Sequence, residues 1–395
     1  MNTTVKNNVL KSLSELLSDN RQKIIDANHQ DISRCDQKNT VLYDRVKIDD
    51  KKISGMISAI NQIIALDDPE NNVLSIHHHS SGLIIENRSV ALGTVLLIYE
   101  SRPDVTIEAA AIAFKAGNKI ILKGGKEAVH TNLVLTQLWQ MALRKHGYNT
   151  EYVGYLDVNR ELLQKLIREN SLQLDLIIAR GGEKLIRSVT EQSSVPVIAS
   201  GRGNNFLYID HESDFAMAEN IILNGKERLS VCNALDKILV NKSLPNLISK
   251  LATLMKKLND REIMIHGDKG LCSISDSVVY METDELMKKE FLSADIAVRL
   301  VDDVDKAVCL INEYSGKHSA AIITENTATA KRFMQNVDCA AVYHNASIRF
   351  TDGGEFGLGS EVAISTQKLH ARGPLGAQQL VTNKWFISGN GQVRI

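Results

Sequence analysis

Cys232 is the residue whose type and setting best suit covalent chemistry. It lies in a polar, glycine-containing stretch, residues 224–236, just before the apolar residues 238–240. A thiolate is a strong nucleophile, and the nearby cations Lys226 and Arg228, or backbone N–H groups, would lower the pKa of such a thiol. An isolated intracellular cysteine is more often a small buried apolar residue. The polar neighbours of Cys232 favour the nucleophile, and those of the other four cysteines do not.

Three turns rich in glycine and charge could hold an anion. They are Tyr99-Glu-Ser-Arg-Pro-Asp104, Lys123-Gly-Gly-Lys-Glu127 and Arg180-Gly-Gly-Glu183. Backbone N–H groups together with lysine or arginine bind phosphate and carboxylate groups. Each turn alone could be an ordinary strand-to-helix connection. Three in one region favour an anion-binding edge, although no dinucleotide-binding GxGxxG and no P-loop is present.

Alternating strands and helices predict the framework that positions these turns. Short apolar runs, typical of buried strands, alternate with helical patterns at 95–98, 105–115, 119–122, 126–145, 174–178, 195–198 and 206–209. Such alternation predicts a parallel sheet whose ligands gather at the carboxyl ends of the strands. After Cys232 a second α/β unit follows, with strand patterns at 237–240, 296–301 and 319–323 and helical patterns at 244–257, 305–314 and 327–334.

The remaining segments have other textures. Residues 1–66 show helical spacing of apolar residues, and 73–91 alternate like a hairpin. Three consecutive histidines, residues 77–79, are expected in a solvated loop, because neighbouring residues of a strand point to opposite faces and do not share a metal ion. The stretch 380–387 again predicts a strand.

Composition limits the class of protein. With 395 residues the chain should form at least two domains, and 44% hydrophobic and 24% charged residues with a net charge of −1 predict a globular protein without affinity for nucleic acid or anionic membrane. Five cysteines without a CxxC pattern argue against a disulfide framework or zinc site. We expect no metal, no signal peptide, no membrane span and a cytoplasmic location.

Seven blocks of the sequence carry a family resemblance. They are Tyr99-Glu-Ser-Arg-Pro103, Leu122-Lys-Gly-Gly-Lys-Glu-Ala128, Arg180-Gly-Gly182, Ser230-Val-Cys-Asn-Ala234, residues 349–359, residues 365–376 and Gly389-Asn-Gly-Gln-Val-Arg394. Together they resemble the signature blocks of the gamma-glutamyl phosphate reductase family, the proline-biosynthesis branch of the aldehyde dehydrogenase superfamily. The resemblance runs from about residue 9 to the end of the sequence.

The resemblance implies an α/β, aldehyde dehydrogenase-like fold with two Rossmann-like parallel-sheet domains and a small β oligomerisation element. By this analogy residues 1–74 and 92–224 form an NADPH-binding domain, 225–364 a catalytic domain, and 75–91 and 365–395 the oligomerisation and C-terminal element. A homo-oligomer, a dimer or larger, is implied because an exposed hairpin edge invites pairing with another chain. A glutamate 5-kinase is a candidate partner.

The resemblance also implies NADPH-dependent reduction of L-glutamyl 5-phosphate to L-glutamate 5-semialdehyde through a thioester on Cys232. The residues implied to bind the cofactor are Lys123, Gly124, Gly125, Lys126, Glu127, Gly181 and Glu290. Those expected to bind the substrate, by charge and motif position, are Arg102, Asn233, Arg349 and Arg372. Ser200 stands where hydrolytic aldehyde dehydrogenases carry the glutamate that activates water.

Several alternatives stay open at this stage. Glu290 follows two lysines and could be solvated, and Arg349 could simply pair with Asp352. The chain could instead be an aldehyde dehydrogenase that acylates coenzyme A, or a catalytically silent binding protein on the same fold.

Overall fold

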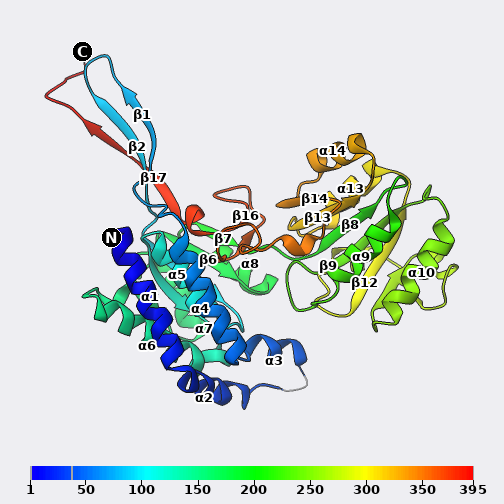
Figure 1. Ribbon diagram of the computed structural model, residues 1–395, viewed down its shortest axis with the longest axis horizontal. Helices are drawn as coiled ribbons and strands as arrows, with labels where there is room; N and C mark the ends of the chain where they lie inside the picture. Colours follow the sequence, from blue (N-terminus) through cyan, green and yellow to red (C-terminus); the bar gives the residue numbers. More distant parts are fainter. Residues whose placement is uncertain (1, 37–38, 395) are drawn as a thin grey trace. The chain divides into compact units, whose positions relative to one another are not determined.

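The computed structural model describes residues 2–36 and 39–394, which form two compact units (Figure 1). Unit 1 comprises Met1–Ser200, Gly353–Ala363 and Pro374–Ile395, and unit 2 comprises Gly201–Asp352 and Ile364–Gly373. The predicted cofactor-binding range extends to residue 224, beyond the end of unit 1 at Ser200. The roles assigned to the predicted ranges stay predictions.

Unit 1 begins with helices, as the sequence predicts. They are α1 (Thr3–Asp19), α2 (Arg21–Ile32), α3 (Thr40–Val46) and α4 (Asp50–Ala65). The side chains of Asn2 and Asp49 accept hydrogen bonds from the first turns of α1 and α4, which explains where these helices start. Helix α1 buries one apolar stripe that includes Leu10, Leu13 and Leu17.

The central sheet of unit 1 is parallel, with the strand order β5-β4-β3-β6-β7. Its strands are β3 (Thr94–Tyr99), β4 (Lys119–Lys123), β5 (Val153–Tyr155), β6 (Leu176–Arg180) and β7 (Val197–Ala199). Its crossovers are α5 (Val105–Lys115), η1 (Lys126–Ala128) with α6 (Val129–Lys145), η2 (Thr150–Tyr152), α7 (Arg160–Glu169) and α8 (Glu183–Gln192). Because the chain adds strands first on one side of β3 and then on the other, the order reverses between β3 and β6.

A three-stranded antiparallel ribbon completes unit 1 and extends from the rest of the unit in Figure 1. It consists of β1 (Val73–His78), β2 (Ile84–Ala91) and β17 (Val381–Ser388), with β1 and β17 at its edges. The predicted hairpin and final strand are therefore present. The expectation that the three histidines lie in a loop is wrong for two of them, because His77 and His78 pair with β2.

Unit 2 is built on a seven-stranded parallel sheet with the order β11-β10-β12-β9-β8-β13-β14. Its strands are β8 (Asn205–Ile209), β9 (Leu235–Asn241), β10 (Met264–Gly267), β11 (Val278–Tyr280), β12 (Asp295–Val301), β13 (Ser319–Ile323) and β14 (Ala341–His344). The sequence pattern predicted that residues 206–209 belong to the first sheet. This prediction is wrong, because the strand, β8, pairs with β9 and β13 in unit 2. A buried strand is uniformly apolar in either sheet, so its composition does not show which sheet it joins.

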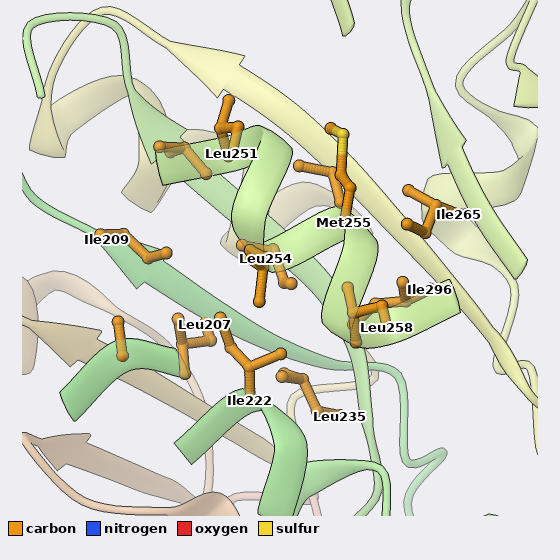
Figure 2. Packing of buried hydrophobic residues seen from close by; sticks show 14 of the residues in the cluster. Leu207, Ile209, Ile222, Leu235, Leu251, Leu254, Met255, Leu258, Ile265 and Ile296 are labelled. Carbon is orange, nitrogen blue, oxygen red and sulfur yellow. The ribbon is translucent and has the colours of Figure 1, made fainter. Parts of the chain in front are cut away.

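The helices of unit 2 cover this sheet. They are α9 (Phe215–Gly225), α10 (Leu247–Asn259), α11 (Lys269–Cys272), α12 (Glu285–Lys288), α13 (Val304–Tyr314) and α14 (Thr327–Asn336). Figure 2 shows α10 inserting Leu251, Leu254, Met255 and Leu258 into the cluster of Leu207 and its neighbours. Burying each such side chain contributes about 1.5–3 kcal/mol, so α10 is fixed mainly by its apolar face.

The remaining elements are short. They are η3 (Ile348–Phe350), β15 (Ile364–Ser365), β16 (Gly373–Pro374) and η4 (Ala377–Leu380). None of the helices in the described part of the chain is long and apolar enough to cross a membrane.

Candidate functional sites in the two units

Cys232 lies in a turn at the amino edge of the sheet in unit 2. The turn connects α9 to β9, and a hydrogen bond of 3.2 Å from Ala234 N to Val231 O closes it. The cysteine is half-buried and is not in a disulfide. The turn expected from the polar residues is thus present, directly before a fully buried strand.

Two residues that the sequence did not single out hold this turn. The side-chain amide of Asn205 donates to the carbonyl oxygens of Cys232 and Ala234, both at 2.7 Å. Its oxygen accepts from Ser319 N at 3.0 Å. Gly203 packs against the same turn, since a Cβ there would lie 2.0 Å from the Cys232 carbonyl oxygen. The backbone of Cys232 is therefore held from strand β8 and the segment before it.

Arg349 supplies positive charge beside Cys232. Its guanidinium contacts the side-chain oxygen of Asn233. The amide nitrogen of Asn233 donates to Arg349 O and Thr351 O, each at 3.0 Å. Burial and the neighbouring Arg228 lower the pKa of Arg349, whereas Cys232 acts to raise it. Arg349 therefore does more than pair with Asp352, and Asn233 holds it beside Cys232.

Glu290 is held in place, although it follows two lysines. One of its carboxylate oxygens accepts from Gly203 N at 2.9 Å, and the side chain is half-buried. The glycine that packs on the Cys232 turn is thus also the partner of Glu290.

Two other cations of unit 2 have different partners from those expected. Lys226, expected near the thiol, is buried and lies 3.4 Å from Asp236 Oδ1. Arg372 donates to Asp338 Oδ1 at 2.8 Å and to Asp338 O at 2.9 Å. Lys317 and Arg372 hold the pKa of the Asp338 carboxyl well below its usual range. The substrate role of Arg372 stays a prediction, and in this structure its guanidinium is bonded to Asp338.

In unit 1 the three turns do lie at one edge of the sheet. The register pairs Ile98 with Lys123 and Tyr99 with Arg180, so β3, β4 and β6 end side by side. The strand order reverses between β3 and β6, and open α/β sheets bind ligands at such a point, outside the carboxyl ends of the strands. Arg102, half-buried, lies in the turn after β3.

The turn after β4 has donors and acceptors that suit a phosphorylated ribose. Lys123 Nζ donates to Gly124 O at 2.9 Å, and burial lowers the pKa of this lysine. Glu127 accepts from Ser101 Oγ at 2.6 Å, and Lys126 is exposed. Carboxylates accept from ribose hydroxyls and ammonium groups bind phosphate, so these side chains fit the adenosine ribose of a dinucleotide.

A side chain on either glycine of this turn would collide with a neighbouring side chain. A Cβ on Gly124 would lie 2.3 Å from Asn132 Nδ2, and one on Gly125 would lie 2.2 Å from Glu127 Oε1. Larger residues would displace the side chains that shape the turn, which explains the Gly-Gly pair.

The turn after β6 already binds a carboxylate, that of Glu100 from the turn after β3. Gly182 N donates to Glu100 Oε2 at 2.9 Å, and a Cβ on Gly181 would lie 2.6 Å from the same oxygen. Arg180 Nη1 donates to Val362 O at 2.9 Å. Since Glu100 lies at the first residues of α8, an anionic ligand would have to compete with it there. This leaves the turn after β4 as the better anion site.

Comparison with known proteins shows the family of this chain. Residues 1–264 match the model of the aldehyde dehydrogenase family. Gamma-glutamyl phosphate reductase from Clostridium perfringens is 43% identical over 397 residues, covering 99% of this chain and 94% of the relative. The protein of the same name from Dictyoglomus thermophilum is 39% identical and covers 100% of this chain and 95% of the relative.

Solved structures agree. The crystal structure of gamma-glutamyl phosphate reductase from Thermotoga maritima superposes with a TM-score of 0.93 at 36% identity, covering 100% of this chain and 95% of that one. An acetylating aldehyde dehydrogenase from Geobacillus thermoglucosidasius gives a TM-score of 0.71 at 16% identity, over 100% of this chain and 94% of that one, and shows a shared fold alone.

Proposed function

The chain belongs to the aldehyde dehydrogenase family and, within it, to the gamma-glutamyl phosphate reductases, and we propose that it reduces L-glutamyl 5-phosphate to L-glutamate 5-semialdehyde with NADPH. This reaction is the second step of proline biosynthesis from glutamate. The observation that carries the proposal is the arrangement around Cys232, a half-buried thiol in a turn held by Asn205 beside the Asn233–Arg349 pair.

Cys232 is the proposed nucleophile. Its sulfur attacks the acyl carbon, the bond from that carbon to the phosphoryl oxygen breaks, and phosphate leaves with the electron pair, so that a thioester remains. Arg349 offers the cationic charge that an acyl phosphate requires, and Asn233 keeps the guanidinium in place. Backbone N–H groups of the turn would stabilise the developing oxyanion. When bound, the reduced nicotinamide cofactor supplies the hydride that converts the thioester to the aldehyde.

Each unit, taken by itself, carries residues that the family resemblance proposes for contacts with a nicotinamide dinucleotide. In unit 1, Lys123, Lys126 and Glu127 would hold the adenosine ribose and its 2′-phosphate, with Gly124 and Gly125 shaping the turn. Family membership implies a nicotinamide cofactor, and the two lysines favour NADPH over NADH. In unit 2, Glu290 would hold the nicotinamide ribose through its carboxylate.

With Ser200 at this position, no carboxylate would activate water to hydrolyse the thioester. A neutral hydroxyl does not take a proton from water near pH 7, and general-base help is typically worth ~10²–10⁴-fold. The acyl-enzyme should therefore wait for hydride in one direction or for phosphate in the other. Hydrolysis would waste an activated glutamyl group.

The reverse reaction tests the function. With pyrroline-5-carboxylate in equilibrium with its open semialdehyde and NADP⁺ in excess, we expect NADP⁺ reduction that requires phosphate. Coenzyme A in place of phosphate should not support it, and coenzyme A-dependent turnover would instead identify an acylating aldehyde dehydrogenase. Sustained glutamate formation without phosphate, at a rate near the phosphate-supported one, would contradict the role of Ser200, and Ser200→Glu should move the enzyme toward that behaviour.

A thiol-reactive probe tests whether the chain is a silent binding protein. Burial, Glu127 and Asp31 raise the pKa of Cys35, which makes Cys35 a slow internal reference. We expect alkylation of Cys232 to be the faster reaction. Equal rates at the two thiols would favour a binding protein without catalysis.

The antiparallel ribbon of unit 1 supports self-association. Leu74 on β1 and Trp385 and Ile387 on β17 are 59%, 54% and 57% exposed, and both strands are edges. Apolar edge strands pair readily with another chain, so we propose a homo-oligomer joined through this ribbon. The cytoplasmic location and a glutamate 5-kinase partner stay predictions from the sequence and its family resemblance.

A further inference from the structure

Three charged side chains are buried at the amino edge of the sheet in unit 2 and have no part in the proposed chemistry. Lys226, Asp236 and Lys237 are 5%, 1% and 0% exposed. Burial lowers the pKa of both lysines, that of Lys237 to about 7, and raises that of Asp236. Burying charges is costly even when they are paired, so this cluster should have a use that an apolar cluster could not supply.

The three side chains hold one loop, residues 289–293, at alternate positions. Lys237 Nζ donates to Lys289 O at 2.8 Å, and Asp236 Oδ2 accepts from Phe291 N at 2.9 Å. Lys226 Nζ donates to Ser293 O at 3.3 Å and lies 3.4 Å from Asp236 Oδ1. Lys237 Nζ also lies 3.7 Å from the centre of the Phe291 ring, within the range of a cation–π interaction.

The loop has no regular structure of its own. It follows the four-residue helix α12 and precedes β12. Leu292 has a φ of 50°, in the left-handed region that a leucine rarely adopts. Such a conformation persists only where surrounding contacts impose it. Here the imposing contacts are those of Asp236 and Lys226 to the residues on either side of Leu292.

Glu290 lies between the first two anchored positions. Its neighbours Lys289 and Phe291 are each fixed by one buried charged side chain. Its own carboxylate accepts from Gly203 N, the residue that packs on the carbonyl of Cys232. Fixing the backbone on both sides of Glu290 therefore fixes where its carboxylate lies relative to the nucleophile turn within the same unit.

We propose that Lys226, Asp236 and Lys237 form a buried clamp on residues 289–293, and that Lys237 is a positioning residue that presents Glu290 to the ribose of the cofactor. The inference rests on the proposed function in one respect only, the cofactor that Glu290 binds. An apolar side chain in place of Lys237 could fill the space but could not donate to Lys289 O.

The Kd for NADPH, monitored through the fluorescence of the bound cofactor, tests the clamp. It is measured for four forms of the full chain: wild type, Lys237→Met, Glu290→Gln and the double variant. Lys237→Met should raise the Kd for NADPH about tenfold, the effect expected from losing one charge-assisted hydrogen bond that orders a binding group. Because Lys237 acts through Glu290, the double variant should bind no more weakly than the weaker single variant.

Lys257→Met is the matched control. Lys257 lies on α10 of the same unit and pairs with Glu219 at 2.7 Å, with its side chain 45% exposed. The Kd of Lys257→Met for NADPH should equal that of the wild type. Removing one partner of a buried charge cluster is costly, but Lys226 Nζ, 3.4 Å from Asp236 Oδ1, would still pair with Asp236 in Lys237→Met, so we expect this variant to fold. Should it not fold, Asp236→Asn replaces it, because this change keeps an acceptor for Phe291 N and removes the attraction for both lysines.

Hydrogen exchange separates the clamp from the proposed function. The amides of residues 289–293 and of Gly203 should exchange faster in Lys237→Met or Asp236→Asn than in the wild type, with or without NADPH. Unchanged exchange and an unchanged Kd in these variants would overturn the clamp, and so would additive effects in the double variant. A wild type that does not bind NADPH would remove the proposed function, and the exchange rates would still decide on the clamp.

Discussion

Units 1 and 2 both have parallel sheets, yet their candidate functional residues lie at opposite edges. In unit 1 the turn Lys123–Glu127 follows the carboxyl end of β4, where helices begin. In unit 2 Cys232 and Glu290 precede the amino ends of β9 and β12, where helices end. Helix N-termini attract anions and helix C-termini do not, so the two edges start from opposite electrostatic conditions.

The difference explains where the cations lie. At the carboxyl edge of unit 1, helices begin and offer backbone N–H groups to an anion. At the amino edge of unit 2, a side chain must supply the positive charge for the proposed substrate, and Arg349 is half-buried there. The proposed anion site at this amino edge thus depends on a cation whose burial must be offset by a specific partner, here Asn233.

Cys232→Ser gives the largest expected effect and tests whether the chemistry at the amino edge of unit 2 can be lost while cofactor binding is kept. Reductase activity should fall by at least about 100-fold, because a serine hydroxyl is a poor nucleophile near neutral pH without a base. The Kd for NADPH should be unchanged. Steady-state rates and NADPH fluorescence measure both, and Cys309→Ser, which alters an exposed thiol on α13, is the control. Activity above about one hundredth of the wild type would remove Cys232 from the mechanism.

Lys126→Met tests cofactor binding at the carboxyl edge of unit 1. The Michaelis constant for NADPH should rise about tenfold and that for NADH much less, because the ammonium group contributes mainly to binding the 2′-phosphate. Alkylation of Cys232 should keep its rate. Lys145→Met, an exposed lysine on α6 of the same unit, should change neither constant. Equal effects on NADPH and NADH would contradict the assignment.

The smallest expected effect concerns the stability cost of cations at the amino edge. Lys237 has a pKa of about 7 in the folded chain, against the ordinary 10.5. Between these values the unfolded chain binds more protons, so the free energy of unfolding should rise with pH from about 7 upward. Lys226 acts in the same direction, and Asp236, Lys289 and Glu290 are the other charges that affect Lys237.

Urea unfolding of the wild type and Lys237→Met measures this cost. Between about pH 6.5 and pH 8 the wild type should gain on the order of 1 kcal/mol relative to the variant. Lys257→Met should follow the wild type at both values. Parallel pH dependence in wild type and Lys237→Met would show that Lys237 has no lowered pKa.

Sequence analysis correctly predicts features that depend on local pattern. Alternation of apolar runs and helical spacing predicts two α/β units, and the polar residues around Cys232 predict its turn. The ribbon follows from the alternation in 73–91 and in 380–387. Glu290 is proposed as a site residue only through the family resemblance, since a glutamate after two lysines is otherwise typical of a solvated surface.

Features that depend on distant pairing are missed. Asn205 and Cys232 are far apart in the sequence, and their hydrogen bond exists because β8 and β9 lie side by side in a parallel sheet. The assignment of β8 to the first sheet fails for the same reason, since strand composition is alike in both sheets. The partner of Arg372, Asp338, was likewise not visible in the sequence.

Residue order alone was enough to predict the glycine turns and the family of this chain and to propose Cys232 as the nucleophile, because each of these rests on short contiguous stretches of sequence. The tertiary structure decided that Cys232 lies at an amino edge and that Lys226, Asp236 and Lys237 hold the loop of Glu290. The physical reason is that a buried charged side chain needs hydrogen-bond partners. Here the partners are backbone groups distant in the sequence, and the chain topology determines which groups those are.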